Sequence, residues 1–246
     1  MQPILVFRHI ECEGPGFFGT VLDRLALPYR IIQVDNGEPV PRDCGGAAAL
    51  VFMGGPMSVN DPLPWISAEL ALIRQAVDRN LPVLGHCLGG QLISRALGGE
   101  ITRNPVTEIG WHDVTRVDDA LTTDWRRCLP ARFEAFHWHG ETFSIPPGAQ
   151  RILQSAFCPN QGFVINNALA LQCHIEMTTA MVDTWADLYR HETATPSVSV
   201  QTRETMLTDL DERVAALQAV AEALYLRWLE PVLRGISAST AEIIRR

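Results

Sequence analysis

Residues 82–91 read PVLGHCLGGQ, and this stretch decides the predicted fold. Its first half is a predicted apolar strand and Leu88–Leu97 is a predicted helix, so Cys87 falls at the turn between them. The pattern G-x-C-x-G in this context is the cysteine form of a nucleophile elbow. Gly85 and Gly89 leave room for close backbone approach, and the helix N-terminus favours a thiolate and can bind an oxyanion. We interpret Cys87 as a reactive thiol; a buried structural cysteine is the alternative.

Apolar strands and amphipathic helices alternate along the first hundred residues. The predicted strands are Pro3–Arg8, Tyr29–Val34, Ala47–Met53 and Leu81–His86, and the predicted helices between them are Phe17–Leu25 and Trp65–Arg79. This alternation is typical of βαβ units, whose central strands are apolar because helices bury both faces of the sheet. The sequence therefore predicts an α/β fold with a mostly parallel sheet and helices on both faces.

The pattern changes after about residue 100. Short strands separated by turns are predicted at Glu100–Arg103, Trp111–Val117, Arg132–His137, Arg151–Ala156, Phe163–Ile165 and Ala168–Cys173, followed by a helix at Thr178–Tyr189. His191–Val200 is polar and predicts a linker, and Arg203–Leu233 predicts one long amphipathic helix that ends near Pro231. We therefore predict one domain over 1–192 and a linker with a helical extension over 193–246. We expect this helix to pack either on its own domain or in the interface of a homo-oligomer or a partner complex.

A thiol nucleophile needs a base, and the base needs a group that orients it. His174 stands at the end of a predicted strand, and Glu176 follows two residues later. Positions two apart in an extended chain point to the same side, so Glu176 can hold one imidazole nitrogen while the other faces the thiol. The carboxyl ends of parallel strands share one edge of a sheet, which is where such folds place their sites. We expect Cys87, His174 and Glu176 to meet there.

A predicted strand also ends at Met53-Gly54-Gly55-Pro56. A Gly-Gly turn presents backbone N–H groups with no side chain in the way, and a tetrahedral intermediate needs such donors. Taken alone, the pattern is weak, because Gly-Gly-Pro usually forms only a tight turn.

These segments resemble the signatures of class I (triad-type) glutamine amidotransferases: GHCLGGQ at 85–91, HIE at 174–176 and MGGPMS at 53–58, in the family's order. FHWHGE at 136–141 is similar to a loop in the amidotransferase domain of GMP synthase. The resemblance covers about residues 1–190. It implies a flavodoxin-like sheet and hydrolysis of the glutamine side-chain amide through a cysteinyl thioester, which releases ammonia.

The resemblance also implies roles for single residues. Cys87 would be the nucleophile, His174 the base and Glu176 the group that orients it. The oxyanion would be bound by the backbone N–H groups of Gly55 and Leu88, with Gly54 in the same turn as Gly55. Gln91 would contact the substrate glutamine, and His139 and Gly140 would border its pocket.

The sequence departs from the family pattern at two of these positions. Ile175 stands where proline is frequent, and His86 stands where an apolar residue is more common. Isoleucine in place of proline at position 175 changes the stiffness of the chain and not the chemistry of the site. We expect the side chain of His86 to point away from Cys87 and to pack behind the site.

No cofactor and no metal are predicted. The sequence lacks G-x-x-x-x-G-K-[ST] and G-x-G-x-x-G. His137 and His139 lie on one strand face, but no third ligand has a fixed spacing to them. An acceptor of ammonia is therefore expected on a synthetase partner chain. We expect low glutaminase activity until that partner, or an acceptor substrate, rotates a peptide in the Met53-Gly54-Gly55-Pro56 turn into place.

Other classes of function stay open. A γ-glutamyl hydrolase of the same fold would act on γ-glutamyl amides larger than glutamine, and a non-catalytic regulatory relative would keep the fold alone. The intact Cys87, His174 and Glu176 speak against the second alternative. A cysteine stress protein of the DJ-1 type would lack the distant H-x-E.

Composition excludes several partners. The chain has 246 residues, 47% of them hydrophobic, and a net charge of −8, so we expect no nucleic acid and no membrane as partner. It has no signal-like N-terminus and no run of eighteen apolar residues, and its expected location is cytoplasmic. Its six cysteines form no C-x-x-C. Five are expected to be reduced and buried, with Cys87 as the exception.

Overall fold

The computed structural model describes residues 1–117 and 125–244. The strands of this part of the chain form one sheet in the order β2-β1-β3-β4-β9-β8-β7-β5-β6. The strands are β1 Ile4–Arg8, β2 Tyr29–Gln33, β3 Ala49–Phe52, β4 Val83–His86, β5 Ile101–Arg116, β6 Arg132–Phe143, β7 Gln150–Ser155, β8 Gly162–Ile165 and β9 Ala168–Leu171. The α-helices are α1 Gly16–Arg24, α2 Pro64–Asp78, α3 Leu88–Ala96, α4 Thr179–Leu188, α5 Arg203–Leu207 and α6 Leu210–Ile244.

The sheet has a parallel half and an antiparallel half. β2, β1, β3, β4 and β9 pair in parallel, while β9, β8, β7, β5 and β6 pair in antiparallel. The α/β fold with helices on both faces is confirmed, and the sheet is mixed because hairpin connections replace crossover helices after α3. Strand β4 pairs in parallel with β9, with His86 opposite Leu171, so the two strands end at the same edge of the sheet.

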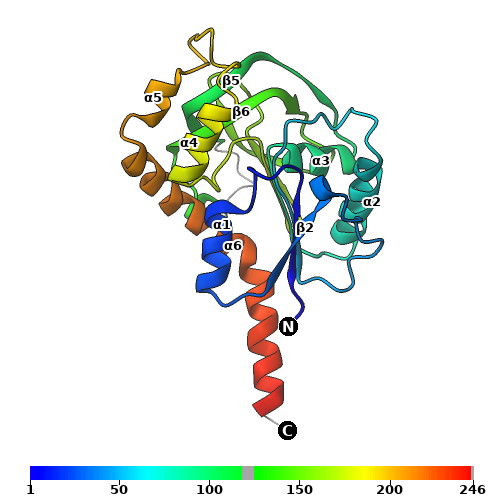
Figure 1. The fold of residues 1–246 in the computed structure, drawn as a ribbon. Helices are drawn as coiled ribbons and strands as arrows, with labels where there is room; N and C mark the ends of the chain where they lie inside the picture. The colour runs from blue at the N-terminus through cyan, green and yellow to red at the C-terminus, as the bar shows by residue number, and fades with distance from the viewer. Residues whose placement is uncertain (118–124, 245–246) are drawn as a thin grey trace.

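Alternate residues of each central strand enter two separate cores. In β3, Ala49 and Val51 belong to the core under α1, α4 and α6, whereas Leu50 and Phe52 belong to the core under α2 and α3. Figure 1 shows these two helical layers on opposite sides of the sheet. The period of two along a strand produces this division, and both faces are apolar because both are covered.

The C-terminal segment differs from the single helix predicted over Arg203–Leu233. Asp209 has a left-handed backbone (φ 53°) and separates α5 from α6, and α6 continues through Pro231 to Ile244. The prediction was wrong at both points because helical periodicity continues across the two-residue break at Thr208 and Asp209, and a proline does not always end a helix.

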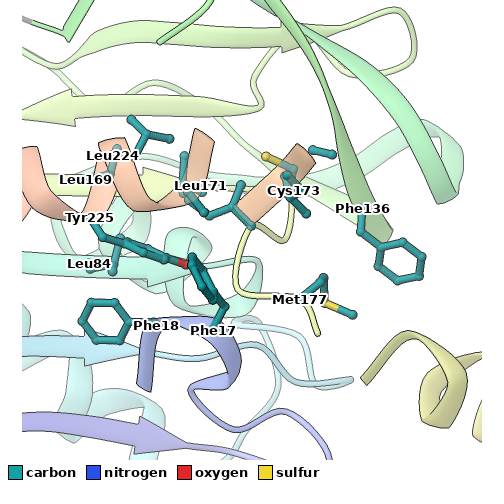
Figure 2. Packing of buried hydrophobic residues seen from close by; sticks show 14 of the residues in the cluster. Phe17, Phe18, Leu84, Phe136, Leu169, Leu171, Cys173, Met177, Leu224 and Tyr225 are labelled. Carbon is teal, nitrogen blue, oxygen red and sulfur yellow. The ribbon is translucent and has the colours of Figure 1, made fainter. Parts of the chain in front are cut away.

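The apolar stripe of α6 packs on the chain's own sheet. Leu224 and Tyr225 of α6 lie in one cluster with Leu84 of β4 and Leu169 of β9, as Figure 2 shows. The indole Nε1 of Trp228 also donates a hydrogen bond to the carbonyl of Val83, at 3.0 Å. The stripe that suggested a homo-oligomer is therefore covered within the chain, and oligomerisation stays a prediction without this support.

The structure differs from the sequence prediction in strand β5 and in the polar segment after α4. Glu100–Arg103 and Trp111–Val117 belong to the single strand β5, whose register with β6 shifts between Arg103 and Glu108. The polar segment after α4 is tied to this strand, since the N–H of Ile109 donates to the carbonyl of Ser199 at 2.8 Å. The domain boundary at 192 stays a prediction. No helix in the described residues is long and apolar enough to cross a membrane.

Candidate active site

Cys87 lies between β4 and α3 with a left-handed backbone (φ 48°, ψ −105°). A non-glycine residue adopts this conformation only under strain, as a nucleophile elbow requires. The turn is tight: a Cβ on Gly85 would lie 2.3 Å from the carbonyl carbon of Gly89, and a Cβ on Gly89 would lie 1.9 Å from the carbonyl oxygen of Phe52. The two glycines of the motif are therefore required by backbone contacts.

His174 and Glu176 follow β9 and lie beside Cys87. Nδ1 of His174 is 2.7 Å from Oε1 of Glu176, and both side chains are buried. The buried position lowers the pKa of His174, but the Glu176 carboxylate and the Cys87 thiol outweigh burial and raise the pKa well above its ordinary value. Burial alone would raise the pKa of Glu176, and the neighbouring His86 and His174 lower it instead. The arrangement suits an imidazolium held between the Glu176 carboxylate and the sulfur of Cys87.

Aromatic side chains and backbone contacts fix the imidazole further. The ring of Trp185 meets the ring of His174 edge-on, with centroids 4.8 Å apart. The backbone N–H of His174 donates to the carbonyl of Phe136 at 2.8 Å, which ties the end of β9 to β6. The orientation of His174 is therefore set by two elements besides its own strand.

His86 packs behind the site, away from the cavity. It is fully buried, and its Nε2 lies 3.0 Å from the hydroxyl of Tyr225 and 3.7 Å from Oε2 of Glu176. Burial lowers the pKa of His86, and the Glu176 carboxylate partly opposes this shift. His86 thus connects α6 to the carboxylate that contacts His174.

The Gly54–Gly55 turn lies at the end of β3, next to the elbow. Gly55 lines the same cavity as Cys87. Within the described part of the chain, neither the N–H of Gly55 nor that of Leu88 donates a hydrogen bond to a protein acceptor. Two unpartnered N–H groups beside a nucleophile have the chemistry of an oxyanion-binding pair.

Gln91 lies near Cys87 but is engaged within the protein. Its amide nitrogen donates to Oε1 of Gln172 at 3.2 Å and to the carbonyl of Glu141 at 3.4 Å. The amide nitrogen of Gln172 in turn lies 3.5 Å from Sγ of Cys87. Gln91 lines the cavity, so its remaining amide oxygen can face a ligand.

His139 and Gly140 lie on β6 and also line the cavity. Nε2 of His139 is 3.0 Å from Oε2 of Glu108, and its Nδ1 is 3.0 Å from the carbonyl of Glu141. The amide of Gln161 donates to the same Glu108 oxygen at 2.7 Å. These contacts hold His139 in place, so it can shape the wall more readily than it can transfer a proton.

A carboxylate lies beside His137 and His139, where no third metal ligand was predicted from the sequence. Possible ligand atoms of Glu108, His137 and His139 lie within 4.8 Å of one another. Glu108 comes from the neighbouring strand β5, where spacing within one strand could not reveal it. Burial lowers the pKa of His137 to about 3, so its ring is neutral. The carboxylate already accepts hydrogen bonds from His139 and Gln161, which accounts for its position.

The cavity that joins these residues has a volume of about 240 Å³. Its wall includes Glu13, Trp138, Trp185, Tyr189 and Glu192, none of which was predicted as a site residue. Glu13 is 6% exposed, and burial raises its pKa to about 7. Its carboxylate reaches the site from the loop after β1, and no spacing or motif connects that loop with Cys87.

The remaining cysteines are free thiols. Cys44, Cys158 and Cys173 are buried as expected, whereas Cys12 and Cys128 are only partly buried. Burial raises the pKa of four of them, Cys12, Cys128, Cys158 and Cys173, and so keeps each of these as a thiol.

Comparison with known families decides what kind of protein carries this site. The model of the family "glutamine amidotransferase class-I" matches residues 22–184. The chain belongs to the class I glutamine amidotransferase family. Within the family, a solved glutamine amidotransferase from Methylobacillus flagellatus is 40% identical, with 94% of this chain and 95% of that chain covered and a TM-score of 0.90.

Curated relatives of this amidotransferase-family chain match over shorter segments. The glutamine amidotransferase-like protein YfeJ of Salmonella typhimurium is 32% identical over 157 residues, which are 61% of this chain and 66% of YfeJ. A GMP synthase [glutamine-hydrolyzing] of Aeropyrum pernix is 35% identical over 117 residues, 48% of this chain and 20% of that protein. The chain thus spans less than two thirds of the length of either relative.

Proposed function

We propose that this chain hydrolyses the side-chain amide of glutamine and releases ammonia for an acceptor on another chain. The observation that carries the proposal is the 2.7 Å contact between His174 and Glu176 at the end of β9, beside the elbow cysteine at the end of the neighbouring β4. A base with an orienting carboxylate next to an activated thiol is the arrangement that nucleophilic acyl transfer requires.

The proposed reaction has two steps. The Cys87 thiolate attacks the amide carbon, and the N–H groups of Gly55 and Leu88 stabilise the oxyanion. His174 gives its proton to the leaving nitrogen, so ammonia departs and a glutamyl thioester remains. In the second step His174 takes a proton from water, whose oxygen attacks the thioester carbon. The thioester bond breaks, glutamate leaves, and the Cys87 thiolate is regenerated beside the protonated His174. Glu176 orients the ring and stabilises the imidazolium in both steps.

The substrate would lie along the cavity between the two glycine segments. Gln91, through its amide oxygen, is the proposed contact to the glutamine. Gly54 keeps the turn free of a side chain, while His139 and Gly140 border the pocket from β6. A relative from Thermococcus kodakarensis is named as one of the subunits of a glutamine-hydrolysing GMP synthase. The division of that enzyme into subunits supports the proposal that the acceptor of ammonia is bound by a separate synthetase chain.

A γ-glutamyl hydrolase is the second candidate. The cavity wall beyond the proposed glutamine contacts carries Trp138, Trp185 and Tyr189. These side chains offer apolar surface to a leaving group larger than ammonia, such as the remainder of a γ-glutamyl peptide.

One experiment tests both candidates. Purified wild-type chain is assayed for ammonia release from glutamine and for amine release from γ-glutamyl peptides, with Cys87→Ala as the inactive control. Faster turnover of glutamine supports the first candidate, and faster turnover of the peptides supports the second. Absence of both activities, with or without fractions of host-cell extract, refutes the proposed function. A rate with glutamine that rises only with one fraction identifies the acceptor chain.

A further inference from the structure

A buried ion pair lies directly behind the Gly54–Gly55 turn. His9 follows β1 and Glu69 belongs to α2; they are 2% and 0% exposed. Nε2 of His9 lies 3.1 Å from Oε2 of Glu69, while its Nδ1 lies 3.0 Å from the carbonyl oxygen of Met53 and 3.3 Å from that of Gly54. One ring therefore connects α2 to the backbone of the turn.

The partners of His9 determine its protonation. Carbonyl oxygens accept hydrogen bonds only, so Nδ1 must carry a proton to bond them, and the carboxylate requires the same of Nε2. The ring is then an imidazolium. Burial by itself lowers the pKa of His9, but Glu69 and the two carbonyls outweigh it and raise the pKa above its ordinary value. Geometry and charge agree on a doubly protonated ring.

The contact with Gly54 also sets the direction of the next N–H. In a trans peptide the C=O and the N–H point in opposite directions, and the described chain contains no cis peptide. Holding the Gly54 carbonyl toward His9 therefore turns the Gly55 N–H away from His9. Glycine does not restrain a peptide rotation by itself because it lacks a Cβ, so the restraint must come from outside the turn.

We propose that His9 is a positioning residue: its Nδ1–H, supported by Glu69, fixes the Gly54–Gly55 peptide so that the Gly55 N–H stays available to a substrate oxyanion. The inference rests on the proposed function and adds how its oxyanion site is maintained. If the rotation expected in the Met53-Gly54-Gly55-Pro56 turn involves the Gly54–Gly55 peptide, a partner that drives it has to break the contact of Gly54 with a buried cation. The contact between His9 and Gly54 therefore determines the orientation of the Gly55 N–H.

A matched pair of variants tests the proposal. Removing His9 alone would leave the Glu69 charge buried without a partner, so both variants carry Glu69→Met. His9→Asn places an amide N–H close to where Nδ1–H was, whereas His9→Leu has nearly the same shape and no donor. The two double variants are similar in size, and asparagine alone can donate a hydrogen bond to the turn. Circular dichroism shows whether both fold.

The readouts separate oxyanion stabilisation from general damage. We expect kcat for the better substrate to fall by about 10²–10³-fold in His9→Leu/Glu69→Met, the usual loss for one oxyanion donor. His9→Asn/Glu69→Met should stay within about tenfold of wild type, with KM similar in both. Alkylation of Cys87 by iodoacetamide needs no oxyanion donor and should be equal in the two variants. Equal kcat in the pair, or equal loss of alkylation and kcat, overturns the proposal.

A second measurement does not depend on turnover or on the stability of a variant. Nitrogen NMR of the His9 ring in the wild-type chain at pH 7–8 should show a proton on Nδ1, in contact with the Gly54 backbone. An unprotonated Nδ1 overturns the inference, since that atom could not then donate to a carbonyl. A chain with a protonated Nδ1 but no hydrolysis of any γ-glutamyl amide would refute the proposed function and leave the His9 contact standing.

Discussion

The hydroxyl of Tyr225 lies 3.0 Å from Nε2 of His86, which joins the last helix of the chain to the strand that leads into Cys87. His86 in turn lies 3.7 Å from Oε2 of Glu176. Helix α6 is therefore part of the support of the proposed triad.

Replacing Tyr225 by phenylalanine should separate the effect of its hydrogen bond to His86 from the effect of its ring packing in the core. Tyr225→Phe removes only the hydroxyl, so we expect a loss of about 1–2 kcal/mol in unfolding free energy and a several-fold decrease in kcat. Trp228→Phe on the same helix is the control, since it removes a hydrogen bond to Val83 but no contact to His86. Urea denaturation and steady-state kinetics compare the two. A similar loss of kcat in both variants would contradict a specific role of the Tyr225–His86 contact.

Gly89→Ala should destabilise the chain although alanine favours helices. The new Cβ would lie 1.9 Å from the carbonyl oxygen of Phe52, a backbone atom that cannot move without displacing β3. We expect a loss of about 3 kcal/mol in unfolding free energy from this overpacking. Gly46→Ala serves as the control, because nothing lies within 4 Å of a Cβ there. Equal melting temperatures for the two variants would show that the elbow tolerates a side chain.

Glu13 gives the stability a defined pH dependence. Burial raises its pKa from 4.5 to about 7, with His174, Glu176, His9 and Glu192 as its charged neighbours. The folded chain therefore binds this proton more tightly than the unfolded chain, and stability falls as the pH rises from about 4.5 to 7. Glu13→Gln removes this effect, so it should stabilise the chain by roughly 2–3 kcal/mol more at pH 8 than at pH 4.5. Urea denaturation at both pH values measures the difference, and the same change at both would contradict it.

The proposed triad should give graded losses of activity. Cys87→Ala removes the covalent path and should leave almost no turnover, and His174→Ala should reduce kcat by about 10³–10⁴-fold. Glu176→Gln keeps the shape of the side chain and should cost less, because Glu176 acts through the imidazole. Cys173→Ala is a suitable control, since this thiol is buried and is not among the residues that line the cavity. An almost fully active His174→Ala variant would refute the assignment of the base.

The sequence was sufficient where the evidence is local. An apolar strand, a cysteine between glycines and a following helix predict the elbow, and the edge rule for parallel strands places His174 beside it. The pairs His9–Glu69 and Glu108–His139 could not be predicted, because their members lie on separate elements and no periodicity links them. The same is true of the face on which α6 packs: an amphipathic stripe shows that a surface is buried, but not against what.

The position of Cys87 and His174 just after two neighbouring strands has a consequence for chain cleavage. The hydrogen-bonded ladder between β4 and β9, and not the intervening segment of sequence, sets the distance between the proposed nucleophile and its base. A protease cut in the intervening segment would leave that ladder in place, and a nicked chain should stay active while its two fragments remain associated. Neither fragment alone holds both groups, so denaturation after nicking would abolish activity until the fragments pair again.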